Sequence, residues 1–196
     1  MKAIETTYNG TVFRSRIEAR WAKLFSLLGL SYVYEPEGFE HCGERYLPDF
    51  WVDGWDTYVA IKPFEDFKKM TGGMKRELYW QGEMAGNGMS LYIIAGTPKP
   101  DGYVCLIPQT VKNLGYVGYV ECLFRDCRRC FGLAIVSRNT KDGLIVGDIG
   151  THKCGEHERI DDESERLEAC MLEAMRERFG ERQDRGSYPQ EQDNEE

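Results

Sequence analysis

The sequence predicts an α/β protein with the element order α-β-β-β-α-β in residues 1–110, followed by a Cys/His-rich module and a C-terminal helix. Three observations predict this order. Residues 12–29 have the period of an amphipathic helix, residues 46–52 and 57–63 have the composition of two paired strands, and residues 91–95 form a short, continuously apolar run that is typical of a buried strand.

The first helix is predicted by an apolar stripe and by the residue that ends it. Residues 1–11 are expected to form an extended lead-in with a turn at Asn9-Gly10. The helix is then expected over 12–29, because apolar residues recur at spacings of three and four and Gly29 stands at the end. The residues of the stripe are Phe13, Ile17, Trp21, Leu24 and Leu28.

Three strands and a second helix should follow. Residues 30–36 are predicted as the first strand and residues 37–44 as a polar turn. Aromatic and β-branched residues on both sides of Asp53-Gly54 then predict a hairpin-like pair of strands. The remaining elements of this part are a helix over 64–86, interrupted at Gly72-Gly73, and strands over 91–95 and 103–107.

Charged residues flank the apolar stripe of the first helix. Arg14, Arg16 and Arg20 are either a solvated helix face or contacts to phosphate, which the planar guanidinium of arginine binds well. Glu18 lies beside the stripe and is either an ion-pair partner of Arg14, four residues earlier, or a residue of a functional site.

An aspartate and a lysine are expected to meet on the paired strands. Asp49 follows a proline at a break in the first strand, and Lys62 lies near the end of the second. A carboxylate can hold Mg²⁺ and a lysine can position or activate a water molecule. Beside an arginine-rich helix, this pair points to phosphodiester chemistry.

In this order and spacing, the residues resemble the PD-(D/E)XK nucleases, the restriction-endonuclease-like family, and in particular its small bacteriophage-type members. Pro48-Asp49 is similar to the first half of the family motif, and Ala60-Ile61-Lys62 is similar to the second half. Glu18 corresponds to the glutamate of the preceding helix. The resemblance covers roughly residues 8–110 and implies an α-β-β-β-α-β core with a mixed sheet.

The resemblance implies a metal-dependent DNA phosphodiesterase, more specifically an endonuclease, with DNA as partner. Asp49, Glu18 and the backbone carbonyl of Ile61 would bind Mg²⁺ or Mn²⁺, and Lys62 would act on the attacking water. Arg14, Arg16 and Arg20 would contact the nucleic acid.

Position 60 departs from the family pattern, because Ala60 stands where the second metal-binding acid is expected. A methyl group cannot bind a hard cation, so the chain as written should cleave DNA slowly or not at all. Three explanations are open: the acid was replaced to disable the nuclease, the chain is a natural phage pseudo-nuclease that binds DNA or a host protein without cleaving, or another carboxylate took over. Candidates for that last role are Glu65, Asp56 and Glu35.

Residues 111–160 form the Cys/His-rich module. Cys127 and Cys130 make one CxxC pair, and Cys154 and His157 make a CxxH pair. Two such pairs around a hairpin predict a structural zinc site of the ribbon type, with Cys122 or His152 as an alternative ligand. Isolated buried thiols and a redox CxxC are the other interpretations of these residues.

The charge of the chain is concentrated at its C-terminal end. Residues 1–155 carry 19 Lys and Arg against 18 Asp and Glu, whereas residues 156–196 carry 6 against 15, which accounts for the net charge of −8. We expect a helix over 161–180 and a disordered acidic tail over 181–196. Seven cysteines, no signal-peptide core and no long apolar run predict a cytoplasmic protein without a membrane span. The oligomeric state stays open, a dimer included.

Overall fold

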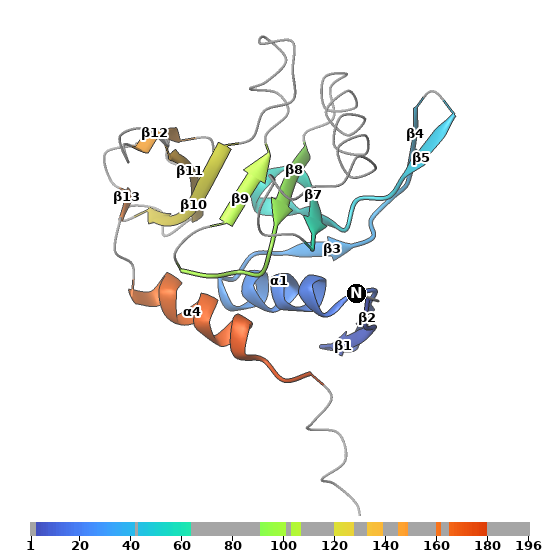
Figure 1. Ribbon diagram of the computed structural model, residues 1–196, viewed down its shortest axis with the longest axis horizontal. Coiled ribbons are helices and arrows are strands. Elements are labelled where there is room, and N and C mark those ends of the chain that lie inside the picture. The colour runs from blue at the N-terminus through green and yellow to red at the C-terminus, as the bar shows by residue number, and fades with distance from the viewer. Residues whose placement is uncertain are drawn as a thin grey trace, which may run out of the picture.

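In the residues that the computed structural model describes, one large β-sheet has two helices on the same side of it (Figure 1). For some of its strands only the backbone is described. The described residues are 3–41, 43–63, 91–100, 103–106, 120–127, 133–138, 145–148, 160–161 and 165–179. The predictions for a helix over 64–86 and for an acidic tail over 181–196 lie outside these residues. No described helix is long and apolar enough to cross a membrane.

The large sheet is mixed, as predicted. Within the described residues its strand order is β12-β11-β10-β9-β8-β7-β6-β3, with β13 paired to β10. Pairing is antiparallel throughout except between β7 and β8, which are parallel. A parallel pair needs a long crossover connection, and the sequence between the two strands, residues 63–90, is long enough for one. The strands are β3 (Tyr32–Tyr34), β6 (Phe50–Val52), β7 (Thr57–Lys62), β8 (Leu91–Ala95), β9 (Tyr103–Leu106), β10 (Val120–Cys127), β11 (Leu133–Arg138), β12 (Ile145–Asp148) and β13 (Ile160–Asp161).

The first helix, α1 (Arg16–Leu27), is shorter than predicted because the chain before it forms a hairpin. Strands β1 (Thr6–Tyr8) and β2 (Thr11–Phe13) are paired antiparallel. Asn9 (φ 48°) and Gly10 (φ 79°) both have positive φ, which suits the tight turn of a hairpin. The predicted lead-in is thus a hairpin around the expected Asn9-Gly10 turn.

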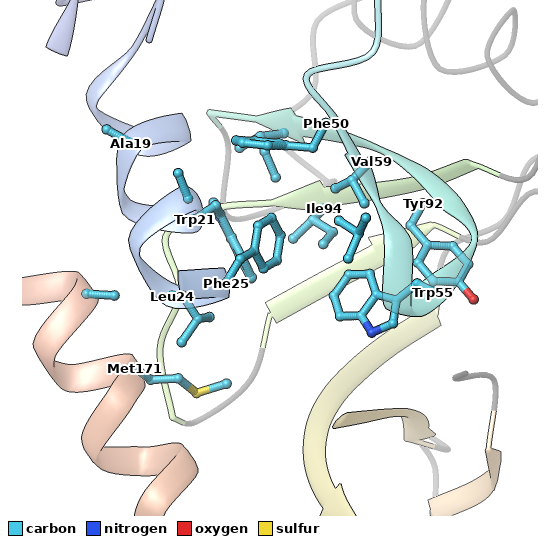
Figure 2. Packing of buried hydrophobic residues seen from close by; sticks show 14 of the residues in the cluster. Ala19, Trp21, Leu24, Phe25, Phe50, Trp55, Val59, Tyr92, Ile94 and Met171 are labelled. Atoms are coloured by element: carbon cyan, nitrogen blue, oxygen red, sulfur yellow. The ribbon is translucent and has the colours of Figure 1, made fainter. Parts of the chain in front are cut away.

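The core lies between α1 and the sheet. Trp21, Leu24 and Phe25 of α1 are fully buried. Trp21 and Phe25 point toward residues of β6, β7 and β8, and Leu24 points toward Met171 of the C-terminal helix (Figure 2). The indole Nε1 of Trp21 donates a 2.9 Å hydrogen bond to the carbonyl of Gly96, directly after β8. This buried bond fixes the helix against the sheet.

The second predicted strand is interrupted. The segment expected over 46–52 is divided between β5 (Glu44–Tyr46) and β6, and residues 47–49 separate the two. The expected polar turn at 37–44 contains β4 (Phe39–His41), which pairs with β5 in a hairpin that projects away from α1 (Figure 1). A short 3-10 turn, Asp53–Trp55, connects β6 to β7.

The C-terminal helix is confirmed with different bounds, as α4 (Glu165–Arg176). It packs beside α1, where its buried residues Leu167, Met171 and Ala174 join the same hydrophobic cluster. Lys23 of α1 also pairs with α4, through a 3.0 Å contact to Glu173. The strands of the Cys/His-rich region are continuous with the large sheet, because β10 pairs with β9.

Candidate functional site

Asp49 is tied to the sheet by its backbone and by its side chain. Its N–H donates to the carbonyl of Val59 at 3.0 Å, and its own carbonyl accepts from the N–H of Glu35 at 2.9 Å. Its Oδ2 accepts a 2.6 Å hydrogen bond from the N–H of Ile61. The carboxylate therefore takes the place of a backbone partner for β7 and is held beside the chain segment that contains position 60.

Positions 60 to 62 lie at the end of β7, next to the carboxylate of Asp49. Val59 and Ile61 belong to the core cluster under α1. Side chains alternate along a strand, so Ala60 and Lys62 point to the other face of the sheet. Ala60 is only 1% exposed, and the positive charge of Lys62 reaches Asp49, where it acts to lower the pKa. The structure thus brings Asp49, Ala60 and Lys62 to one place.

Glu18 is buried and is held by two hydroxyl groups. Ser15, the N-cap residue of α1, donates from Oγ to Glu18 Oε1 at 2.7 Å and accepts from the N–H of Glu18 at 3.3 Å. The hydroxyl of Tyr34 donates to Glu18 Oε2 at 2.7 Å. The alternative of an ion pair with Arg14 is therefore not what holds Glu18 in place.

Arg14 instead bridges two other carboxylates. Its Nη2 lies 2.5 Å from Asp49 Oδ1, and its Nε lies 2.8 Å from Glu35 Oε1. Its backbone N–H donates to the hydroxyl of Tyr34 at 2.9 Å. The three acids Glu18, Asp49 and Glu35 are thus gathered around one arginine and one tyrosine. We call this group, with Ala60 and Lys62 beside it, the acidic centre.

Burial has the largest effect on the pKa of Asp49. It raises this pKa to about 6, and the negative charge of Glu18 acts in the same direction. The N–H of Ile61, Arg14 and Lys62 lower the pKa but do not cancel the effect of burial. The pKa of Arg14 is raised, since attraction to the acids outweighs its own burial. Both pKa values are raised, which favours the charged form of Arg14 but the neutral form of Asp49. We attribute this difference to exposure, because the Arg14 side chain is half exposed and that of Asp49 is not.

As arranged here, the acidic centre does not fit a divalent metal ion. Both oxygens of Asp49 already accept hydrogen bonds, one of them from a cation. Ala60 offers no oxygen on its side chain. Within the described part of the chain, no three His, Cys, Asp or Glu side chains are placed so that they could hold a metal.

The three arginines of the nucleic-acid prediction have different environments. Arg14 is engaged within the acidic centre, whereas Arg16 and Arg20 have no carboxylate partner among the described residues. The side chain of Arg20 is partly buried, and its Nε lacks a hydrogen-bond partner there. Burial and the like charge of Arg16 lower the pKa of Arg20.

The predicted zinc ligands lie outside the residues whose side chains are described. Cys127 is the last residue of β10, and its backbone pairs with Ile160, three residues after His157. Cys130, Cys154 and His157 are outside the described residues, as is His152. The structural zinc site stays a prediction.

Two contributors to the site were not predicted. Ser15 could have been found, because Ser15 and Glu18 have the S-x-x-E spacing of a capping box at a helix start. Tyr34 has no such local signal, since it reaches Glu18 from β3, 16 residues further along the chain. Only the packing of β3 under α1 brings its hydroxyl there.

No family model, no curated protein and no solved structure matches the chain. Any functional conclusion therefore depends on the residues of the acidic centre and on the topology around them.

Proposed function

We propose that this chain is a DNA phosphodiesterase of the PD-(D/E)XK type, and more specifically an endonuclease. Its metal site is incomplete because Ala60 replaces an acid. As written, the chain binds DNA and cleaves it slowly or not at all. One observation carries the proposal: the carboxylate of Asp49 is hydrogen bonded to Ile61, the residue between Ala60 and Lys62. The two halves of the motif, 11 residues apart between Asp49 and Ala60, thus meet in space.

The order of the elements gives independent support. The chain runs from α1 through the antiparallel strands β3, β6 and β7 to β8, which is parallel to β7. These elements agree with part of the α-β-β-β-α-β order that the motif resemblance implies, and the helix expected between β7 and β8 lies outside the described residues. Glu18 faces the same centre from α1, with 7% of its surface exposed. A buried glutamate is costly unless it is used or well bonded, and here two hydroxyl groups hold it.

Arg16 and Arg20 are the residues that we assign to DNA contact. They lie one turn apart on α1, repel each other and lack an acidic partner in the part of the chain that the structure describes. Phosphate oxygens would supply the missing negative charge, and guanidinium groups bind them with two donors. Arg14 is removed from this group because its charge is already neutralised by Asp49 and Glu35.

A second candidate function is a binding protein that never cleaves. The contact between Arg14 and Asp49 favours it, because a cation of the chain itself occupies the carboxylate that a nuclease needs for its metal. On this hypothesis Ala60 is natural, and the fold binds DNA or a host protein.

Replacing Ala60 with glutamate separates the two functions. Ala60→Glu adds a carboxylate on the residue that precedes Ile61, and this second acid should allow Mg²⁺ or Mn²⁺ to displace Arg14 from Asp49. The variant should then cleave supercoiled, linear or branched DNA with either metal. The parent chain and the double variant Ala60→Glu, Lys62→Ala should show no such cleavage. If Ala60→Glu folds, as judged by circular dichroism, and still cuts none of the substrates with either metal, the binding-protein function is favoured.

A further inference from the structure

Arg14 lies where the negative charges of the acidic centre converge. It is the residue immediately before the N-cap of α1, and its guanidinium turns back toward the sheet to contact Asp49 of one loop and Glu35 of another. A third acid, Glu18, adds to the attraction that raises the pKa of Arg14.

The backbone is shaped to keep the bridge in place. Glu35 has a φ of 47°, a left-handed conformation that is uncommon for a residue other than glycine. Its N–H donates to the carbonyl of Asp49 at 2.9 Å, so the two acids that Arg14 joins are also joined through the backbone. Tyr34, the residue before Glu35, accepts from the N–H of Arg14 and donates to Glu18. The chain on both sides of the guanidinium is therefore held by hydrogen bonds.

We propose that Arg14 is the resident cation of the acidic centre, and that it takes the place at Asp49 that a divalent metal ion would otherwise take. Arg14 and the metal then exclude each other. A metal ion would need an oxygen of Asp49, and two cations on one carboxylate repel each other across a few ångström. The absence of an acid at position 60 and the presence of this arginine thus have the same effect, which is to keep metal out.

The inference concerns the site of the proposed function but does not depend on cleavage. Its test measures binding of a metal, so a chain that never cuts DNA can confirm or overturn it. A failed cleavage assay with Ala60→Glu would leave the competition between Arg14 and metal to be decided by binding alone.

The experiment is a calorimetric titration of the full chain with Mn²⁺. Arg14→Gln keeps the length and polarity of the side chain and removes its charge. It should bind Mn²⁺ at least about tenfold more tightly than the parent, because one nearby charge changes the occupancy of a carboxylate by about that factor or more. Adding Asp49→Asn to Arg14→Gln should abolish the gain, which places the ion at Asp49.

Arg45→Gln is the matched control. Arg45 also pairs with a carboxylate, that of Glu40 at 3.6 Å, but it lies on the hairpin of β4 and β5 with 89% of its side chain exposed. Freeing that surface acid should leave the Mn²⁺ affinity at the parent value. A gain in Arg45→Gln equal to that in Arg14→Gln would mean non-specific binding to a freed acid and would overturn the proposal.

The Mn²⁺ affinity of a variant is informative only if the variant is folded. If Arg14→Gln does not unfold cooperatively, Arg14→Met replaces it, since methionine keeps an unbranched side chain and removes the charge that contacts Asp49 and Glu35. Arg14→Met should then bind Mn²⁺ more tightly than the parent. Equal affinity in the parent and in the folded Arg14 variant, whether both bind or neither does, overturns the proposal.

Discussion

The N–H of Ile61 donates a 2.6 Å hydrogen bond to the carboxylate of Asp49, and this bond joins two parts of the chain that lie 12 residues apart in the sequence. Without it, an N–H of β7 would lack a partner where Asp49 leaves the strand ladder. The bond therefore serves the sheet and the acidic centre together, and it makes Asp49 a structural residue as well as a candidate functional one.

The first prediction concerns the pH dependence of folding stability. Because the pKa of Asp49 is raised from 3.8 to about 6, the folded chain takes up a proton before the unfolded chain does as the pH falls. The protonation of Asp49 therefore adds to the free energy of unfolding. This contribution is complete below pH 3.8 and is lost as the pH rises through about 6. Asp49→Asn should remove this dependence, which amounts to about 3 kcal/mol at most between these limits.

Urea unfolding of the parent and of Asp49→Asn at several pH values from 4 to 8 measures the effect. The parent should lose stability relative to Asp49→Asn over the lower half of this range. Asp56→Asn is the control, because Asp56 is exposed on the turn before β7 and its replacement should leave the pH profile of the parent unchanged. A constant difference between parent and Asp49→Asn at every pH would contradict the prediction.

The second prediction concerns Tyr34, whose pKa is raised mainly by burial. Tyr34→Phe removes the hydroxyl that donates to Glu18 and accepts from Arg14, and it leaves two polar groups of the centre without that partner. The hydrogen bond to Glu18 is partly buried and its acceptor is a carboxylate, and losing the donor of such a bond costs about 1–3 kcal/mol, so the free energy of unfolding should fall by that amount.

Tyr58→Phe is the comparison for Tyr34. The hydroxyl of Tyr58 also donates to a carboxylate, that of Glu37, but at an exposed position. Its removal should cost less than about 0.5 kcal/mol in denaturant unfolding, as is usual for exposed polar contacts. If both variants lose the same stability, the hydroxyl of Tyr34 does not hold the acidic centre in the way that we describe.

Helical periodicity and residue composition predicted α1, α4 and the strands β3, β6, β7, β8 and β9 of the described fold. The α1 stripe was visible because Trp21 and Leu24 recur at helical spacing, and β8 because its five residues are all apolar and all buried. The bounds were less predictable. Thr11–Phe13 has an apolar residue in register with the stripe but pairs with β1, since the Asn9-Gly10 turn places it in a hairpin. Local period cannot show such a tertiary choice.

Some members of the candidate site were predictable, but their contacts were not. The motif resemblance located Glu18, Asp49 and Lys62, and the structure brings the latter two together. The motif resemblance could not show that Arg14 would turn from the helix face to Asp49, because that contact spans 35 residues and depends on how β6 lies beside α1. Glu35, considered only as a substitute for the missing acid, is a partner of Arg14.

The last prediction separates the arginines by DNA affinity. If Arg16 and Arg20 contact phosphate, the variant with glutamine at both positions should bind duplex DNA more weakly than the parent. The negative slope of log affinity against log salt concentration should become shallower by about 2. The physical reason is that binding releases about one counterion for each phosphate contact, so each contact that is lost removes about one released counterion. Arg14→Gln should leave the slope nearly unchanged, because its charge is paired with Asp49 and Glu35 rather than open to phosphate. Fluorescence anisotropy at a series of salt concentrations measures all three proteins, with Arg45→Gln as the control on a distant hairpin. A slope that falls equally in Arg14→Gln and in the Arg16, Arg20 pair would show that the three arginines act as one phosphate-binding face.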